Sequence, residues 1–421
     1  MIVPEALYAS PNALAPHYAR FRVAERLLLT GHSHQAWPDC GFAGQCEAWA
    51  DAAQYLDDKW ERAFARAERV GRGFARLLDD GAGDYALGAS THELVVRFLS
   101  ALPLRARPRI VTTDGEFHTL RRQLDRLAEE RLEIVKVAHL PAATLAERLS
   151  EAVDDRTAAV MVSLVFYDNG HIVPRLGDVQ RRCEQAGAEL LVDAYHALNV
   201  VPVSLPRDGL ERAFVVGGGY KYCQLGEGNC FLRIPRDCAL RPVVTGWFSE
   251  FVALAHGESG GGVAYGPSAA RFAGATYDPT SHYRAARVFD FFEEHGLTPS
   301  FLREVSQHQV GLVAQLFDAL DADPGVIARE RSVPLEEIGG FLALRSPRAS
   351  ELCGRLRKRG VLTDFRGESL RLGPAPYLSD AQLVAAVAAL WEALSERPRL
   401  RKACGERRRL VNPSAVRARI T

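Results

Sequence analysis

Amphipathic stretches and short apolar runs alternate along this chain from about residue 60 onward. In the amphipathic stretches apolar residues recur every three or four positions, which is the spacing of one helix face. This spacing predicts helices over 58–80, 91–102 and 119–130. The apolar runs are of strand length and predict strands over 109–114, 132–138, 157–167, 188–194 and 213–219.

Regular alternation of strand and helix predicts an α/β fold, with a mostly parallel central sheet covered by helices. In such sheets ligands bind beyond the carboxyl ends of the strands. After about residue 285 the pattern changes to two helices, over 284–296 and 300–320, followed by mixed helix and strand segments. We therefore expect a large α/β domain over 46–290, and a smaller α+β domain built from 1–45 and 291–421.

Composition narrows the class of protein. The chain has 421 residues, 47% of them hydrophobic, and a formal net charge of +0, so no overall field favours nucleic acid or an acidic membrane surface. Its longest apolar runs, such as 158–167, are far shorter than the ~20 residues of a membrane span. The eight cysteines form no CxxC pair, which indicates reduced thiols and no structural zinc or other metal site. We expect a cytoplasmic globular protein with no nucleic-acid or membrane partner.

The arginine-rich end of the chain, over 397–410, is the one strongly basic segment. It could form a patch for nucleic acid or membrane, but a solvated terminus is the more common form of such a segment.

A single lysine, Lys221, stands between two tyrosines at the end of an expected strand, in "AFVVGGGYKYCQLGEGNC" (213–230). Aromatic and apolar surroundings favour the neutral amine of a lysine, and a neutral amine can form a Schiff base. A surface lysine in a glycine-rich turn is the alternative. A P-loop is a third reading, but the stretch lacks the GxxxxGK[ST] spacing.

Asp193 and His196 reach the same sheet edge from the preceding strand, in "LLVDAYHALNVVPVSL" (190–205). Pyridoxal phosphate acts as an electron sink when a carboxylate keeps its ring nitrogen protonated. Asp193, 28 residues before Lys221, is suited to that task, and His196 could reach the phenolic oxygen of the cofactor. The alternative is structural, with Asp193 as a helix cap and His196 as a core histidine.

The remaining parts of a cofactor site also have candidates. Ser90 and Thr91 begin a helix, and a helix N-terminus favours a phosphate, although the same pair could be an ordinary N-cap. Phe117 follows a strand and could stack on the cofactor ring, with His118 as the rival.

Taken in order, the hydroxyl pair, the aromatic residue, the Asp-x-x-His block and the lysine resemble the fold-type I, class V pyridoxal-phosphate-dependent enzymes. Within that class the chain is most similar to the kynureninase family. The stretches that carry this resemblance are "GHS" (31–33), "DAYHALNVVPVSL" (193–205), "GYKY" (219–222), "GWFSE" (246–250) and "LRLGPAPYLSD" (370–380).

The resemblance implies roles for further residues. Lys221 and Tyr220 would be catalytic, with Tyr220 also reaching the cofactor phosphate. Arg371 would bind the α-carboxylate of the substrate, although it could be a surface arginine on a strand. Trp247 would line the cofactor and substrate pocket, either within one chain or across a dimer interface. The last two assignments are Thr276, as a phosphate ligand from the partner subunit, and His34, as a substrate contact.

The implied activity is hydrolytic Cβ–Cγ cleavage of L-kynurenine, 3-hydroxykynurenine or a related aryl-ketone amino acid to anthranilate and L-alanine. This reaction belongs to amino-acid metabolism, for example tryptophan catabolism, and the fold type implies a homodimer. The chain departs from the family at Leu120, where an aspartate is usual, at His34 and Gln35, and over 277–285. An aminotransferase, another carbon–carbon or carbon–sulfur lyase, a desulfurase and a non-catalytic regulator therefore remain alternatives.

Overall fold

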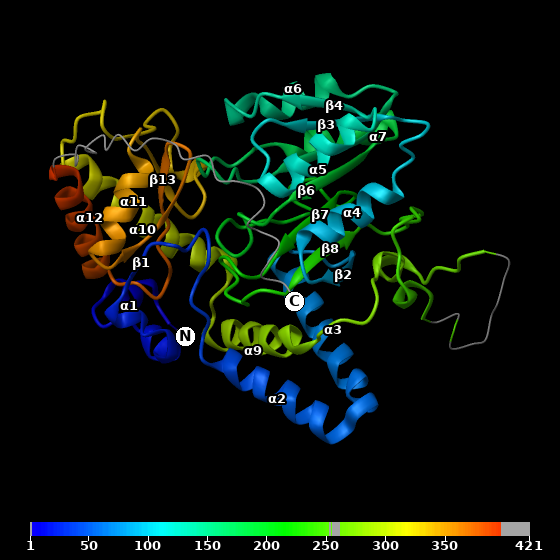
Figure 1. Ribbon diagram of the computed structural model, residues 1–421, viewed down its shortest axis with the longest axis horizontal. Helices are drawn as coiled ribbons and strands as arrows, with labels where there is room; N and C mark the ends of the chain where they lie inside the picture. Colours follow the sequence, from blue (N-terminus) through cyan, green and yellow to red (C-terminus); the bar gives the residue numbers. More distant parts are fainter. Residues whose placement is uncertain (1, 252–253, 255–261, 397–421) are drawn as a thin grey trace, which may run out of the picture.

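The computed structural model describes residues 2–251, 254 and 262–396 (Figure 1). Its centre is a seven-stranded sheet in the order β2-β8-β7-β6-β5-β3-β4. The strands are β2 (Asp84–Gly88), β3 (Arg109–Thr113), β4 (Glu133–Val137), β5 (Thr157–Ser163), β6 (Glu189–Asp193), β7 (Phe214–Gly218) and β8 (Cys230–Ile234). Strand β8 is antiparallel to β2 and β7, whereas the other neighbours in this sheet pair in parallel. The predicted α/β class with a mostly parallel sheet is confirmed.

Helices cover both faces of this sheet because its central strands are apolar on both sides. In β5, which is buried throughout, Ala159 and Met161 pack in the cluster that contains α4 and α5 residues, while Val160 and Val162 pack in the cluster on the other face. The helices of the sheet region are α2 (Cys40–Tyr55), α3 (Lys59–Leu77), α4 (Thr91–Ala101), α5 (His118–Glu129), α6 (Leu145–Ala152), α7 (Leu176–Ala186) and α9 (Thr280–His295).

A second, antiparallel sheet lies in the C-terminal part of the chain, in the order β12-β13-β10-β9. Its strands are β9 (Ala328–Arg329), β10 (Leu342–Arg345), β12 (Asp364–Arg366) and β13 (Ser369–Leu372). The helices around it are α10 (Pro299–Ala319), α11 (Ala349–Lys358) and α12 (Asp380–Ser395). Short 3-10 helices lie at Ala15–Phe21 (η1), Val23–Glu25 (η2), Leu56–Asp58 (η3), Ala142–Thr144 (η4), Trp247–Glu250 (η5), Ser268–Phe272 (η6) and Leu335–Glu337 (η7).

The N-terminal segment packs on this C-terminal part. Strand β1 (Leu27–Leu28) pairs in parallel with β11 (Val361–Leu362), and α1 (Pro4–Tyr8) lies near α10 (Figure 1). Helix α2 runs across the predicted boundary at residues 45 and 46 and packs along α9. The division into 46–290 and the flanking segments therefore stays a prediction.

Two sequence-based expectations concern binding to nucleic acid or membranes. The arginine-rich segment 397–410 lies outside the described residues. Among the helices of residues 2–251, 254 and 262–396, none has the length and apolar character needed to cross a membrane.

Candidate active site

The carboxyl ends of β5, β6 and β7 meet the N-terminus of α4 at a cavity of about 230 Å³. Seven residues singled out from the sequence line this cavity: Ser90, Thr91, Phe117, Asp193, His196, Tyr220 and Lys221. The fold thus brings together side chains from four segments that are far apart in sequence, at the sheet edge where ligands bind in this architecture.

Lys221 is buried at the centre of this group, with 6% of its surface exposed. Its Nζ atom lies 2.6 Å from Nε2 of His196 and 4.5 Å from the ring centre of Tyr195. Burial lowers the pKa of Lys221 to about 7, against the opposing charge of Asp193, because an ammonium loses its hydration in such a site. A large share of the lysine is therefore neutral amine at neutral pH, as covalent attachment of a carbonyl compound requires.

His196 is the hydrogen-bond partner of this amine. Burial, together with the charge of Lys221, holds the pKa of His196 well below its usual value, so the imidazole is neutral. Its second ring nitrogen, Nδ1, is buried and has no hydrogen-bond partner among the residues that the structure describes. A buried polar atom of this kind is costly unless a ligand or water satisfies it.

Asp193 ends β6 at the cavity wall. Its Oδ1 accepts a hydrogen bond from the backbone N–H of Tyr195 at 2.9 Å. Burial raises the pKa of Asp193, opposed by this N–H group and by the charge of Lys221. A buried carboxylate in this position would be stabilised by a charged N–H donor such as a protonated ring nitrogen.

The glycines before Lys221 let other side chains approach the strand end closely. A Cβ atom on Gly218 would lie 2.6 Å from Cζ of Tyr195 and from Sγ of Cys230. A Cβ atom on Gly219 would lie 2.6 Å from Cδ1 of Leu225. A side chain at Gly218 would therefore displace the Tyr195 ring that lies beside the Lys221 amine, and one at Gly219 would displace Leu225.

The start of α4 is both a helix cap and a wall of the cavity. The Ser90 hydroxyl accepts from the N–H of Glu93 at 3.4 Å, and the Glu93 carboxylate accepts from the N–H of Ser90 at 3.3 Å, which completes a capping box. The ordinary N-cap is thus present, and it does not exclude an anion, because the positive end of the α4 dipole faces the same cavity.

The ring of Phe117, and not that of His118, lines the cavity. The ring centre of Phe117 lies 5.4 Å from Nζ of Lys221, and the Tyr167 ring lies edge-on to Phe117 at 5.4 Å. Leu120, at the position where the family has an aspartate, is a core residue with 4% exposure, and its neighbour Thr119 lines the cavity instead.

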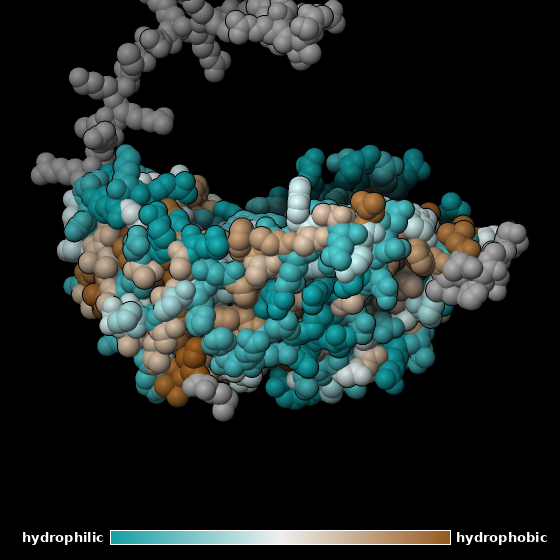
Figure 2. All heavy atoms as spheres, turned by 90° about the horizontal axis from the view of Figure 1, so that it is seen from below, coloured by the Kyte–Doolittle hydropathy of each residue, from teal (hydrophilic) through white to brown (hydrophobic). Residues whose placement is uncertain are grey.

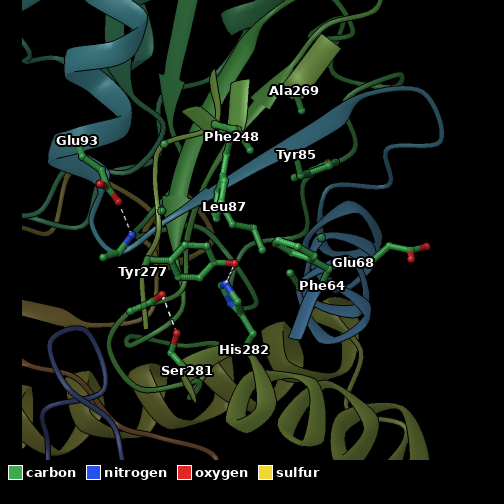
Figure 3. Close-up of a pocket in the computed structure, with 18 of the residues that line it drawn as sticks. Phe64, Glu68, Tyr85, Leu87, Glu93, Phe248, Ala269, Tyr277, Ser281 and His282 are labelled. Carbon is green, nitrogen blue, oxygen red and sulfur yellow. Dashed lines mark hydrogen bonds between the residues drawn. The ribbon is translucent and has the colours of Figure 1, made fainter. Parts of the chain in front are cut away.

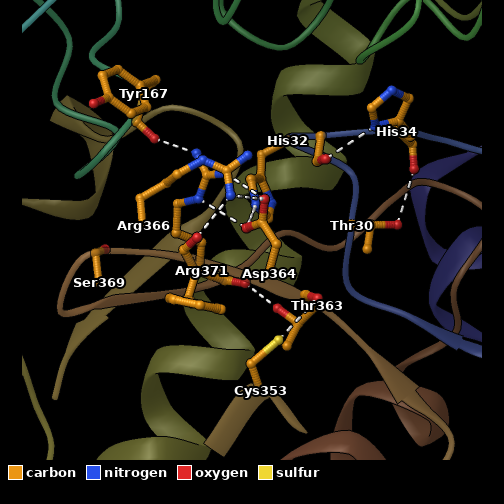
Figure 4. A network of polar contacts seen from close by, with 12 residues as sticks. Thr30, His32, His34, Tyr167, Cys353, Thr363, Asp364, Arg366, Ser369 and Arg371 are labelled. Atoms are coloured by element: carbon orange, nitrogen blue, oxygen red, sulfur yellow. Dashed lines mark hydrogen bonds and ion pairs between the residues drawn. The ribbon is translucent and has the colours of Figure 1, made fainter. Parts of the chain in front are cut away.

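Arg371 and His34 lie just outside the cavity and touch residues that line it. Arg371 is buried on β13, where its Nη1 donates to the carbonyl oxygen of Tyr167 and its guanidinium pairs with Asp364 (Figure 4). The imidazole of His34 stacks on the ring of Tyr220, with ring centres 4.7 Å apart and planes 14° apart. Both side chains therefore lie directly behind residues that form the cavity wall, Tyr167 and Tyr220.

Trp247 and Thr276 lie away from this cavity in the single chain. Nε1 of Trp247 donates to Oγ1 of Thr276 at 3.3 Å, and Trp247 is 48% exposed. Thr276 lines a larger groove of about 1280 Å³, with the aromatic residues Phe64, Tyr85, Phe248 and Tyr277 (Figure 3). The sequence-based assignment of these two residues to the cofactor, with Thr276 acting from a partner subunit, stays a prediction.

The groove and the cavity are neighbours. Ala89, Glu227 and Gly228 line both of them. The polar residues Ser281 and His282 also face the groove (Figure 3), and the Ser281 hydroxyl donates to the carbonyl oxygen of Gly228 at 3.0 Å. A second chain covering the groove could therefore reach the mouth of the cavity.

Sequence reasoning missed several residues that line the cavity: Thr119, Ser163, Val165, Tyr167, Tyr195, Glu227 and Cys230. Tyr195 lies inside the Asp-x-x-His block, so its position between Asp193 and His196 was a usable signal. Tyr167 ends the strand predicted over 157–167, which was a second one. For the others, the sequence carries no local signal.

The proteins that this chain resembles in sequence include kynureninases and an aminotransferase. Residues 302–390 match the family described as the kynureninase C-terminal domain. The chain is 27% identical over 415 residues to the kynureninase of Pseudomonas fluorescens, covering 92% of this chain and 94% of that protein. It is 30% identical over 260 residues to the kynureninase of Burkholderia pseudomallei strain 1106a, covering 57% of this chain and 59% of that protein. An uncharacterized aminotransferase of Bacillus subtilis, YcbU, is 23% identical over 368 residues, covering 84% of this chain and 92% of that protein.

Solved structures share the fold at low sequence identity. A cysteine desulfurase from Thermococcus onnurineus superposes with a TM-score of 0.76 at 15% identity, covering 94% of this chain and 98% of that one. A variant of C-DES, with glycine covalently linked to its pyridoxal-phosphate cofactor, superposes with a TM-score of 0.75 at 13% identity, covering 90% of this chain and 98% of that one. These matches identify the architecture as fold-type I.

Proposed function

The chain is a kynureninase-like member of the class V, fold-type I family of pyridoxal-phosphate-dependent enzymes, and from this premise we propose that it hydrolyses the Cβ–Cγ bond of an aryl-ketone amino acid. The substrate would be L-kynurenine, 3-hydroxykynurenine or a close relative, and the products an anthranilate and L-alanine. The observation that carries this proposal is the buried Lys221 amine, held at 2.6 Å from His196 in a cavity that also contains Asp193.

The residues of the cavity fit pyridoxal phosphate. When bound, the cofactor supplies an electron sink that stabilises negative charge developing on the substrate. Lys221 would attach it covalently, Asp193 would hold its ring nitrogen, and His196 would face its phenolic oxygen. Phe117 would pack on its ring. Ser90 and Thr91 would hold the phosphate at the start of α4. The capping box does not exclude this, because the positive end of the helix dipole favours an anion there.

The chain's own groups would carry the proton transfers. The Lys221 amine, with a pKa of about 7, can take up the α-proton of the substrate. Burial raises the pKa of Tyr220, so its phenol is protonated at neutral pH and can donate a proton to the β-carbon. Hydrolysis adds the hydroxyl of water to the ketone carbon and a proton to the β-carbon as the bond between them breaks. Arg371 would hold the α-carboxylate, and His34 would pack near the aryl group beside Tyr220.

A homodimer is part of the proposal. The described surface near η5 carries a cluster of exposed aromatic side chains, in which Trp247 and Phe251 are 48% and 45% exposed and Phe64 is 37% exposed. Figure 2 shows a few hydrophobic side chains among mostly hydrophilic ones at the right-hand end of the face it presents, and others toward its left-hand end. Large exposed apolar patches mark interaction sites. A second copy seated here would bring its Trp247 and Thr276 to the groove beside the cavity, as the family resemblance implies.

We also propose that the protein acts in the cytoplasm, in amino-acid metabolism such as tryptophan catabolism. The cysteines, which form no CxxC pair, and the kynureninase relatives support this assignment.

Desulfurase chemistry has less support from the cysteines. It needs an accessible, reactive thiol. Cys230 lines the cavity but is 4% exposed, and burial raises the pKa of its thiol to about 12. Cys353 is buried in α11, where its thiol donates to the carbonyl oxygen of Thr363.

A panel of reactions tests the proposed function. The pyridoxal-phosphate-loaded protein is incubated with L-kynurenine, with L-cysteine, and with an amino acid plus a 2-oxo acid, and anthranilate, sulfide and new amino acids are measured. We expect anthranilate from kynurenine as the main product, and none from the Lys221→Ala variant. Sulfide or transamination in place of anthranilate would contradict the proposal and select one of the alternatives.

A further inference from the structure

Arg371 and Asp364 face each other across two neighbouring strands. They are register partners on β13 and β12. Nε of Arg371 donates to Oδ1 of Asp364 at 2.9 Å, and Nη2 donates to Oδ2, so the carboxylate binds the side of the guanidinium with both oxygens (Figure 4). Oδ1 also accepts from Nε2 of His32 at 2.7 Å. Asp364 thus links Arg371 to the N-terminal segment of the chain.

This pairing leaves part of the guanidinium available. An arginine has five N–H donors. Among the described residues, Asp364 accepts from Nε and Nη2, and the carbonyl oxygen of Tyr167 accepts from Nη1. One N–H remains on each terminal nitrogen, and a carboxylate can accept from two such groups. Asp364 and a substrate carboxylate can therefore bind the same guanidinium at different N–H groups.

The burial of the three residues makes the arrangement rigid. The side chains of His32 and Arg371 are 0% and 3% exposed, and that of Asp364 is 20% exposed. Burial alone would raise the pKa of Asp364, but the hydrogen bonds from His32 and Arg371 and the charge of Arg371 hold it well below its usual range. Burial lowers the pKa of His32 to about 4, so the imidazole is neutral at pH 7 and serves as a hydrogen-bond donor to Asp364.

We propose that Asp364, held by His32, is a positioning residue that fixes the Arg371 guanidinium so that its terminal N–H pair receives the α-carboxylate of the amino-acid substrate. This inference rests on the proposed role of Arg371 in the active site. Without the carboxylate of Asp364, the guanidinium would be free to turn toward other acceptors, such as the Tyr167 carbonyl that it already contacts. Substrate affinity would then fall because the carboxylate would have to reorder the arginine on binding.

The test measures binding and not turnover. L-Alanine and L-alaninamide, which lacks the carboxylate, are titrated calorimetrically into the pyridoxal-phosphate-loaded wild type and the Asp364→Asn variant. We expect the variant to bind L-alanine about 10- to 100-fold more weakly, the usual effect of losing a residue that orients a binding group, and to bind L-alaninamide as the wild type does. The Asp364→Glu variant should recover part of the lost affinity.

A control variant tests whether the loss of any aspartate from an Asp–His pair would weaken binding. Asp380, at the start of α12, pairs with His308, with Oδ1 of Asp380 2.9 Å from Nε2 of His308. Asp380→Asn therefore removes another Asp–His pair and should leave the affinities for both ligands unchanged. If Asp364→Asn fails to fold, His32→Phe keeps the Asp364–Arg371 pair, removes one hydrogen bond and should weaken L-alanine binding in the same direction by a smaller factor.

Three outcomes would overturn the inference. Tighter L-alanine binding by Asp364→Asn would mean that Asp364 competes with the substrate for Arg371. Equal loss for L-alanine and L-alaninamide would mean a general structural role. Equal affinity of the wild type for both ligands would remove Arg371 as the carboxylate partner. A wild type that discriminates between the two ligands but does not cleave kynurenine would sink the proposed function and leave the positioning role standing.

Discussion

Nζ of Lys221 lies 2.6 Å from Nε2 of His196, at the point where β7 and β6 deliver both residues to the same cavity. Neither group carries a full charge at neutral pH, because burial lowers the pKa of both. The site therefore favours a neutral amine, and the burial of this amine lowers the stability of the cofactor-free protein at neutral pH.

The first prediction follows from the pKa of Lys221. In the unfolded chain the lysine titrates near its ordinary value, about 10.4, and in the folded protein near 7. Between these values the unfolded state binds more protons, so stability rises with pH. Lys221→Met removes this dependence. We expect the variant to melt at a higher temperature than the wild type near pH 7, and this gap to narrow as the pH approaches 10, in thermal melts of the cofactor-free proteins.

The control for this prediction is Lys136→Met, because Lys136 forms an exposed ion pair with Asp125. Its melting difference should be small at all pH values. A gap between Lys221→Met and the wild type that does not change with pH would contradict the low pKa of Lys221.

The second prediction separates stability from cofactor binding at Asp193. Asp193→Asn removes a carboxylate whose burial is unfavourable, so the cofactor-free variant should be at least as stable as the wild type. Its affinity for pyridoxal phosphate should fall roughly 10- to 100-fold, the value of one charge-assisted hydrogen bond. Melting curves and cofactor titration measure the two effects. Unchanged cofactor affinity would remove Asp193 from the site.

The third prediction concerns the aromatic surface near η5. Trp247 and Trp391 have almost the same exposure, 48% and 47%, but Trp391 lies on α12, away from the groove. We expect Trp247→Glu to convert a dimer into monomers, because a charge placed in an apolar interface loses its hydration. Trp391→Glu should leave the assembly unchanged. Light scattering coupled to gel filtration gives the mass, and a dimeric Trp247→Glu variant would place the interface elsewhere.

The fourth prediction tests the meaning of Leu120. Although the family has an aspartate at this position, Leu120 packs in the core with Leu124 and Phe98. Leu120→Asp should therefore lower the free energy of unfolding by at least about 2 kcal/mol, because it buries a carboxylate among apolar side chains. Leu120→Met, which keeps the volume, should cost much less. Urea unfolding measures both, and a stable aspartate variant with improved activity would mean that the site had lost a cofactor ligand here.

The sequence predicted the elements whose pattern is strong and local. Strands β3 to β7 are continuous apolar runs or follow helices of clear period, and the residues at their ends were correctly expected to share one edge. Strands β2 and β8 lie at one side of the sheet and were missed: β2 (Asp84–Gly88) is short and only partly apolar, and β8 (Cys230–Ile234) follows a glycine-rich segment with no helical pattern before it. Helix α2 was missed because its sequence, rich in alanine and glycine, has a weak apolar face.

The parts of the site that were missed depend on contacts between distant segments. His32 and Asp364 are 332 positions apart, and nothing in either local sequence indicates that they share a hydrogen bond. Trp247 and Thr276 were assigned to the cofactor; in the single chain Thr276 lines the neighbouring groove and Trp247 donates a hydrogen bond to it. Their position relative to a cofactor depends on a second chain, which a sequence does not describe.

The proposed chemistry depends above all on covalent attachment of the cofactor to Lys221. The chain has only five lysines: Lys59, Lys136, Lys221, Lys358 and Lys402. Reduction of the pyridoxal-phosphate-loaded protein with borohydride, followed by mass mapping of its peptides, therefore assigns the attachment site with little ambiguity. We predict that the peptide containing Lys221 gains the mass of the reduced cofactor and that the other four lysines stay unmodified. Attachment at another lysine, or no attachment, would contradict the account.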